Sequence, residues 1–266
     1  KLKSYIKREL KEDMKLYGDE RRCELNAHEA AQALSEDELL PATATTVVLS
    51  KMGWVRAAAS ADIDATSLTY RLGDSFLSKA SGKSNEIASF ISNKGRLYAV
   101  DIRDLPSARS QGEPLSAKVK FAAGEVPVHV LIANSSDKYL LATNKGYGFI
   151  CNGKDLQTRN RSGKALITLD SDAEVFTPFK LTSYESDLVV VASKAGRLLI
   201  YKVSELPNLS SGRGNKLINI NGSKLAVGAD GIAAITIVPE NSFLIIHCGK
   251  RVLNLSATEL ADRISS

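Results

Sequence analysis

The chain has 266 residues, of which 44% are hydrophobic and 24% are charged, ordinary values for a soluble globular protein with a packed core. No apolar run approaches the roughly 20 residues that a membrane helix needs, and no signal peptide opens the chain. The net charge of +5 is compatible with a polyanionic partner but does not identify one.

The three cysteines are far apart and form no CxxC motif. This pattern argues against a disulfide framework or a zinc site and favours a reducing compartment. The chain also opens without an initiator Met, so we expect it to be part of a longer protein.

Residues 1 to about 18 are predicted to form a helix, because apolar side chains recur at helical spacing, at Ile6, Leu10, Met14 and Tyr17. Gly18 is expected to cap its C-terminus. A polar stretch over 19–40 follows, with a candidate for a second short helix near 29–33, and Pro41 closes it. The sequence therefore predicts a helix and connector over 1–40 and a separate domain over 41–266.

Beyond Thr45, short apolar runs alternate with Gly, Asn, Ser and Asp, which is typical of strands joined by tight turns. One unit recurs: an apolar strand, a polar turn with Lys and Gly, a second apolar strand, and then an acidic residue before Leu or Ile. Its five copies lie at 48–55, 90–100, 141–150, 191–200 and 246–253. A single hairpin cannot bury its apolar face alone, so copies spaced by roughly 40–55 residues favour a ring of blades over a solenoid.

A polar loop with Gly and at least one Arg follows each of the three middle copies, at 107–115, 158–166 and 210–217. Repetition should place these loops at equivalent points of successive blades, so that their charges line one rim. Arg and Lys neutralise phosphates, which makes the loop cations the first set of DNA-binding candidates: Arg109, Arg159, Arg161, Lys164, Arg213 and Lys216. The lysines of the hairpin turns are a weaker second set, because Lys is common in exposed turns: Lys51, Lys94, Lys145, Lys194 and Lys250.

The sequence offers little that points to catalysis or metal binding. His247 and Cys248 are adjacent, so on a strand their side chains point to opposite faces and cannot bind one metal ion together. The only other candidate singled out, His129, is far away in the sequence, and no residue spacing suggests a third ligand. The glycine-rich loop at 210–216 fits no Walker pattern and leads into a strand. We expect no catalytic residue and no metal site. For the two aromatic residues that follow turn glycines, Trp54 and Tyr147, core packing is favoured over stacking on bases.

Nearly the whole chain resembles the C-terminal part of the A subunit of bacterial DNA topoisomerase IV, the ParC-type subunit. The most specific stretches are Gly53-Trp54-Val55-Arg56, 105–115, 146–149, 159–167 and 214–216. Residues 17–22 resemble the segment that ends the long coiled-coil helix of the catalytic core.

The resemblance implies a mostly β fold, a β-pinwheel of about five blades that borrow strands from their neighbours, preceded by the helix and connector. It implies that the domain binds and bends duplex DNA without sequence specificity and presents it to the core for ATP-dependent strand passage in decatenation and relaxation.

The resemblance also places this chain within a type IIA topoisomerase but after its catalytic tyrosine, so the chain alone should be inactive. It implies no cofactor here, with Mg²⁺ and ATP bound elsewhere in the enzyme. The implied partners are double-stranded DNA, the B subunit of topoisomerase IV and a second A subunit, with no membrane span, at the nucleoid in the bacterial cytoplasm.

Two departures from the family pattern matter. The Gln-Arg-Arg-Gly-Gly-Lys-Gly box of DNA gyrase is absent, and the loops at 109–114, 159–165 and 211–216 look like degraded versions of it. This disfavours the nearest alternative, the wrapping domain of the gyrase A subunit. The Arg/Gly-rich stretch usual before an Asp-Arg-Ile ending is also not found before Asp262. A protein-interaction propeller remains the alternative from another functional class.

Overall fold

The computed structural model describes residues 1–20, 42–170 and 172–264. The chain divides into two compact units, Lys1–Leu40 and Pro41–Ser266. The first contains helix α1 (Leu2–Tyr17), which matches the prediction, and Gly18 is its C-cap, with its N–H donating to Met14 O at 3.1 Å. The candidate helix at 29–33 lies outside the described residues.

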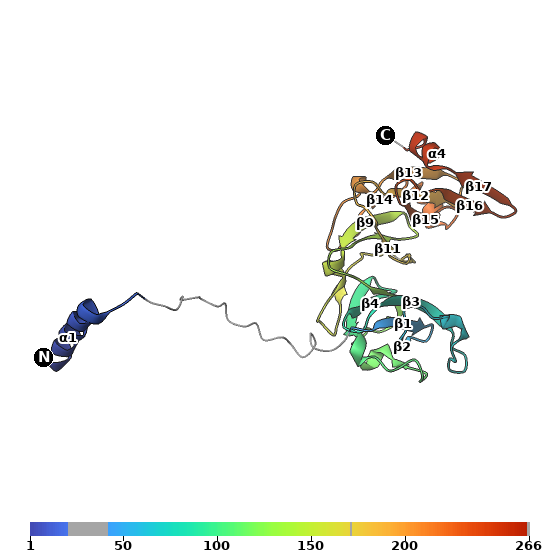
Figure 1. The fold of residues 1–266 in the computed structure, drawn as a ribbon. Helices are drawn as coiled ribbons and strands as arrows, with labels where there is room; N and C mark the ends of the chain where they lie inside the picture. The colour runs from blue at the N-terminus through green and yellow to red at the C-terminus, as the bar shows by residue number, and fades with distance from the viewer. Residues whose placement is uncertain (21–41, 171, 265–266) are drawn as a thin grey trace. The chain divides into compact units, whose positions relative to one another are not determined.

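Each of the five predicted copies is a β-hairpin (Figure 1). The turn glycine of every copy has a positive φ, between 61° at Gly249 and 91° at Gly146, which a residue without a Cβ adopts at little cost. The hairpins are β1 (Ala44–Ser50) with β2 (Trp54–Ala58), β4 (Ile87–Ser92) with β5 (Arg96–Asp101), β8 (Lys138–Ala142) with β9 (Tyr147–Asn152), β12 (Leu188–Ser193) with β13 (Leu198–Lys202), and β16 (Leu244–Cys248) with β17 (Arg251–Leu255).

A third strand pairs antiparallel with the first strand of each of the first four hairpins. These strands are β3 (Phe76–Lys83), β7 (Pro127–Ile132), β11 (Phe179–Lys180) and β15 (Ile232–Val238). We number the resulting sheets one to five along the chain. Within the described residues the fifth sheet consists of β16 and β17.

A fourth, two-residue strand completes each of the first three sheets, and it comes from the loop that trails the next hairpin. The strands β6 (Glu113–Pro114), β10 (Lys164–Ala165) and β14 (Asn215–Lys216) pair with β2, β5 and β9. Each sheet therefore borrows a strand from its successor, which is the exchange expected of a pinwheel. The sheet orders are β3-β1-β2-β6, β10-β5-β4-β7 and β11-β8-β9-β14, followed by β13-β12-β15 and β16-β17.

The apolar core lies between successive sheets. One cluster joins sheets one and two, the next joins two and three, and two further clusters join three to four and four to five. None of these clusters joins the described residues of sheet five to sheet one, so the sheets form an open series. Figure 1 shows the first and last sheets at opposite ends of the unit.

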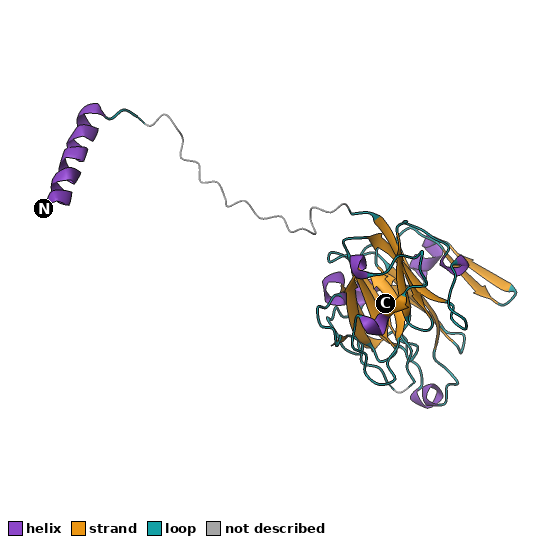
Figure 2. Cartoon of the chain, turned by 90° about the horizontal axis from the view of Figure 1, so that it is seen from below, coloured by secondary structure: helices purple, strands orange, loops and turns teal. Residues whose placement is uncertain are grey.

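Short helices occupy the margins of the strands (Figure 2). Three follow the second strand of a hairpin and end at the Leu predicted from the repeat or one residue before it: η2 (Ile102–Asp104), η4 (Gly153–Leu156) and η5 (Val203–Glu205). After β17 the corresponding helix is α4 (Ala257–Asp262), in which Leu260 is buried. The remaining helices are η1 (Ala65–Ser67), η3 (Leu115–Ala117) and α3 (Gly222–Ala226).

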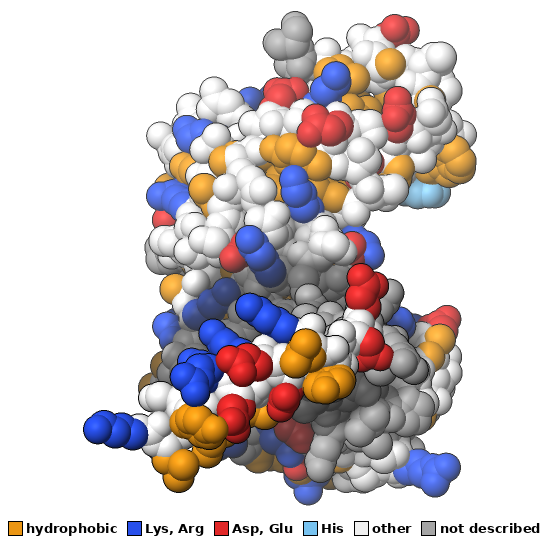
Figure 3. Space-filling model, turned by 60° about the vertical axis from the view of Figure 1, so that its left-hand side comes forward, with side chains coloured by type: hydrophobic (Ala, Val, Ile, Leu, Met, Phe, Trp, Pro, Cys, Tyr) orange, Lys and Arg blue, Asp and Glu red, His pale blue; other side chains and the backbone are white. Residues whose placement is uncertain are grey.

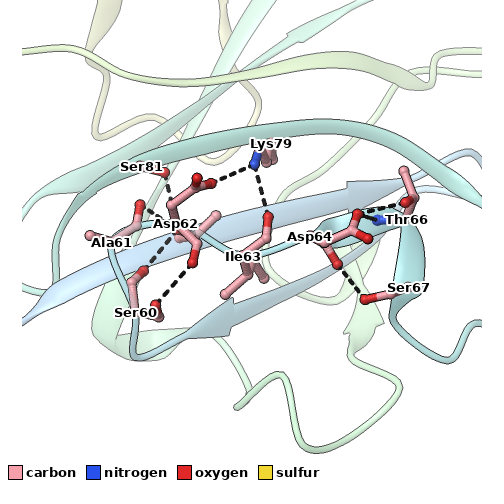
Figure 4. Close-up of polar contacts among 10 residues, drawn as sticks. Ser60, Ala61, Asp62, Ile63, Asp64, Thr66, Ser67, Lys79 and Ser81 are labelled. Atoms are coloured by element: carbon pink, nitrogen blue, oxygen red, sulfur yellow. Dashed lines mark hydrogen bonds and ion pairs between the residues drawn. The ribbon is translucent and has the colours of Figure 1, made fainter.

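Side-chain polar contacts tie the connection between β2 and β3 to the first sheet (Figure 4). Lys79 Nζ contacts Asp62 Oδ1 and Ile63 O, both at 2.8 Å, while Asp64 accepts from the N–H and hydroxyl of Thr66. The ammonium of Lys79 lowers the pKa of Asp62. The ammonium of Lys79 therefore stabilises the fold and is not counted among the candidate DNA-binding cations.

Candidate nucleic-acid interface

Strand exchange brings each trailing loop against the hairpin turn of the preceding sheet. The Leu that follows each exchanged strand donates its N–H to the carbonyl of the turn glycine: Leu115 to Gly53 at 2.9 Å, Leu166 to Gly95 at 3.0 Å and Leu217 to Gly146 at 2.8 Å. The two sets of predicted cations thus share the same end of each of the first three sheets. Lys51 belongs with the Arg109 loop, Lys94 with Arg159, Arg161 and Lys164, and Lys145 with Arg213 and Lys216.

The middle of these three assemblies has the most cations. Arg159 and Arg161 are exposed, Lys164 is half-buried on β10, and none of the three side chains has a hydrogen bond or ion pair among the described residues. The loop itself is held rigidly, because the Asn160 carboxamide accepts from Ser162 N–H at 3.0 Å and Gly163 N–H donates to Asn160 O at 2.9 Å. Unpaired cations on a fixed backbone can bind phosphate without first breaking an internal ion pair.

Two further cations that the sequence reasoning missed adjoin this loop. Arg96 Nη2 donates to the carbonyls of Ser162 at 2.7 Å and Gly163 at 3.0 Å, and the backbone N–H of the exposed Lys120 donates to Arg161 O at 2.8 Å. Arg96 directly follows the turn glycine, a repeated position that could have revealed it. Lys120 lies outside the repeat and had no such signal.

Arg213 differs from the other candidates. Its Nη2 is 2.6 Å from Asp170 Oδ2, and its guanidinium carbon lies 3.9 Å from the centroid of the Tyr147 ring. An arginine with both partners is less available to a phosphate. A second contact between an arginine and an aromatic ring occurs at Trp54, where the guanidinium carbon of Arg71 lies 4.1 Å from the ring centroid. Both aromatic rings are half-buried and face an arginine.

The turns of sheets four and five have no exchanged loop beside them among the described residues. Lys194 and Lys250 are exposed there, while Arg197 forms an ion pair with the buried Asp230 at 3.1 Å. The backbone N–H of Gly231 lowers the pKa of Asp230, and the backbone N–H of Ala195 and the guanidinium of Arg197 act in the same direction. These turns therefore offer isolated cations instead of a combined set.

The remaining candidates all keep free side chains. Lys51, Lys94, Arg109 and Lys216 are exposed, Lys145 is half-buried, and none has a side-chain hydrogen bond or ion pair within the described residues. In the upper part of the space-filling view, Lys and Arg side chains lie apart from one another among uncharged side chains (Figure 3).

The His, Cys, Asp and Glu side chains that could bind a metal ion or take part in catalysis are not clustered among the described residues. Within residues 1–20, 42–170 and 172–264, no cluster of His, Cys, Asp and Glu could hold a metal ion, and no helix is both long and apolar enough to cross a bilayer. Burial lowers the pKa of His129, whose Nε2 lies 2.8 Å from Val175 O. Burial also raises the pKa of the Cys151 thiol to about 12, while Cys248 is exposed.

Comparison with known proteins agrees with this architecture. The family model described as "DNA gyrase C-terminal domain, beta-propeller" matches residues 89–134, 137–181 and 187–239, three segments that begin at β4, β8 and β12. The chain is 46% identical over 260 residues to the A subunit of DNA topoisomerase 4 from Escherichia coli strain K12, an alignment that covers 98% of this chain and 34% of that protein. The chain thus spans about a third of the length of the curated relatives it matches.

Two solved structures are similar. The E. coli ParC C-terminal domain superposes with a TM-score of 0.76 at 46% identity, covering 84% of this chain and 91% of that one. The DNA gyrase A C-terminal domain superposes with a TM-score of 0.57 at 17% identity, covering 81% and 72%. The second match shows a shared fold alone.

Proposed function

Because this chain belongs to the family of C-terminal domains of the topoisomerase IV A subunit, we propose that it binds and bends duplex DNA without sequence specificity. It presents the bound segment to the catalytic core for ATP-dependent strand passage, in decatenation and relaxation. The proposal includes work in bacteria, at the nucleoid, in an enzyme with the B subunit and a second A subunit.

The observation that carries this proposal is the seating of cationic loops by strand exchange. Arg159, Arg161 and Lys164 project from a loop fixed against the turn that bears Lys94, and their side chains have no partner among the described residues. Phosphate contacts of this kind position a duplex without reading its bases. No helix longer than six residues occurs among the described residues of 42–264, so this part of the chain offers no recognition helix to fill a major groove.

The role of the gyrase A domain is the weaker alternative. Its wrapping box is absent from this sequence, and Arg213, in the loop corresponding to one degraded copy, is engaged by Asp170 and Tyr147. We therefore expect this chain to bend duplex DNA without wrapping it into a negative supercoil.

Binding and bending are tested together with doubly labelled duplexes of two unrelated sequences. Fluorescence anisotropy should give similar affinities for both, and energy transfer between the duplex ends should rise on binding as the ends approach. A strong preference for one sequence, or binding without any change in energy transfer, would contradict the proposal. The same preparation, incubated with supercoiled plasmid, Mg²⁺ and ATP, should leave the plasmid unrelaxed, because the catalytic tyrosine of the family lies outside this chain.

A further inference from the structure

Among the described residues, the fourth sheet lacks the strand that completes the first three. Its order is β13-β12-β15, so within this part of the chain β13 is an edge strand along its whole length. In the first three sheets the corresponding strand, β2, β5 or β9, is paired at its start by β6, β10 or β14. An unpaired edge is a template on which an extended peptide can add a strand.

The three strands that occupy this position share one motif, Gly-x-x-Leu, at 112–115, 163–166 and 214–217. The leucine is buried in every case, with exposed fractions of 0% at Leu115 and 1% at Leu166 and Leu217. The two residues between the glycine and the leucine are Glu-Pro, Lys-Ala and Asn-Lys. Because these pairs differ in charge and size, the receiving sheet does not select for their side chains.

The glycine of the motif is required by close approach to the receiving strand. A Cβ on Gly112 would lie 2.5 Å from Val55 O, one on Gly163 would lie 2.7 Å from Leu97 O, and one on Gly214 would collide with Gly148 O. All three glycines also have positive φ, from 68° to 88°. The first and last residues of the motif are therefore both fixed by contact with the receiving sheet.

The receiving features recur on the fourth sheet, where the described residues leave them open. Gly196 has a φ of 83°, like the turn glycines that accept the leucine N–H, yet no donor among the described residues bonds to its carbonyl. Leu198 corresponds to Val55 and Leu97, which are 0% exposed, but it is 36% exposed. The described chain beyond β17 forms α4 and buries Leu260 elsewhere, so it does not cover this edge.

A pocket lies where the motif leucine would be buried. Its volume is about 330 Å³, and it is lined by Val190, Ala192 and Leu198 of the fourth sheet and by Leu244 and Ile246 of the fifth. The first two sheets show the equivalent site in its filled form, because Val47, Leu49 and Val55 share one cluster with Leu115 and with Phe90 of the next sheet. Exposed hydrophobic side chains are visible in the upper part of Figure 3, where the last two sheets lie in Figure 1.

We propose that the β13 edge binds a Gly-x-x-Leu segment of a partner polypeptide as an added antiparallel strand. The segment's leucine N–H donates to Gly196 O, its side chain fills the pocket between sheets four and five, and its glycine passes over Leu198 O. This peptide-binding site is separate from the DNA-binding loops of the first three sheets, so its failure and the failure of the proposed function are distinguishable.

The probe is a fluorescent peptide with the sequence of residues 211–220, which already forms this strand on the third sheet. Its anisotropy should rise saturably with the 266-residue chain. Peptides with Gly214→Ala or Leu217→Asp should bind at least about tenfold more weakly, a change equivalent to about 1.4 kcal/mol. Absence of saturable binding by the parent peptide, or equal binding by all three peptides, would overturn the proposal.

A protein variant tests the location of the site. Leu198→Asp places a charge in the pocket at an exposed position, and it should weaken peptide binding at least about tenfold. The matched control is Leu253→Asp, since Leu253 is 46% exposed on β17 and does not line the pocket. Far-UV circular dichroism checks that both variants are folded. Peptide binding retained by folded Leu198→Asp, or lost equally in Leu253→Asp, would refute a site at this edge.

Discussion

At the scale of single residues, ion pairing decides which cations can reach a phosphate. Arg213 is held by Asp170, 43 residues earlier in the chain, and by the Tyr147 ring. We predict that Asp170→Asn tightens duplex binding, because it removes a negative charge and releases Arg213. Exposed ion pairs of this kind are worth about 0–1 kcal/mol, so the gain should be up to about fivefold at low salt.

The measurement is fluorescence anisotropy with a labelled duplex at low ionic strength. Asp262→Asn on α4 is the control, because it changes the net charge equally at an exposed position in the described chain. Equal gains in the two variants would mean that only net charge matters and that Arg213 gains nothing from its release.

His129 gives the molecule a pH dependence of stability. Burial lowers its folded-state pKa below the ordinary value of about 6.5, so the unfolded chain binds a proton first as the pH falls. Stability therefore decreases as the pH falls through about 6.5 and continues to decrease down to the folded pKa, below which the loss from this group is complete.

We predict that His129→Gln reduces the drop in melting temperature between pH 7.5 and pH 5, an interval chosen to span about one unit or more on either side of that value. The control is His247→Gln at an exposed position, and an equal reduction in both variants would mean that the burial of His129 is not the cause. Thermal denaturation followed by circular dichroism measures both, and an unchanged drop in His129→Gln would show that this histidine does not carry the effect.

At the scale of elements, the glycine that precedes each exchanged strand should control how firmly the loop is seated. A Cβ at Gly163 would come within 2.7 Å of both Leu97 O and the Tyr98 ring, whereas one at Gly73 would meet nothing within 4 Å. Both glycines have positive φ, 68° and 82°. We predict that Gly73→Ala costs about 1–2 kcal/mol of unfolding free energy from backbone strain, and that Gly163→Ala costs about 1–3 kcal/mol more.

Urea unfolding of the two variants separates these contributions, because the strain is common to both and the close approach is specific to Gly163. If both variants lost the same stability, the loop would not be seated against β5 as described.

The hairpins could be predicted from sequence because each carries its own signal: an apolar run, a turn glycine and a second apolar run. The exchanged strands could not, since Lys164-Ala165 and its counterparts are two residues long and acquire their pairing from a different copy of the repeat. Only the resemblance to a family indicated the exchange. Likewise the loop cations Arg159 and Arg161 could be selected by repetition, but the engagement of Arg213 depends on the distant Asp170.

At the scale of the whole strand unit, successive sheets are joined by shared apolar clusters into an open series. The sheets become smaller toward the C-terminus: among the described residues, each of the first three has four strands, the fourth has three and the fifth has two. The five sheets match the five copies in the sequence, and the small fifth sheet matches the weakest of them. DNA contact is accordingly expected on the first three sheets, where loop and turn cations combine.

The most direct test of this account is the salt dependence of duplex binding by the wild-type chain and by Arg159→Glu/Arg161→Glu/Lys164→Glu. The matched control is Lys3→Glu/Lys7→Glu/Lys11→Glu on α1, which changes the net charge equally at exposed positions. Each phosphate contact contributes about 0.9 to the slope of log K against log salt concentration, so loss of three contacts should flatten the slope by about 2.7. We predict this flattening and weaker binding on two unrelated duplexes for the loop variant, with a smaller change for the α1 variant. A folded loop variant that kept both the affinity and the slope of the wild type would contradict the account.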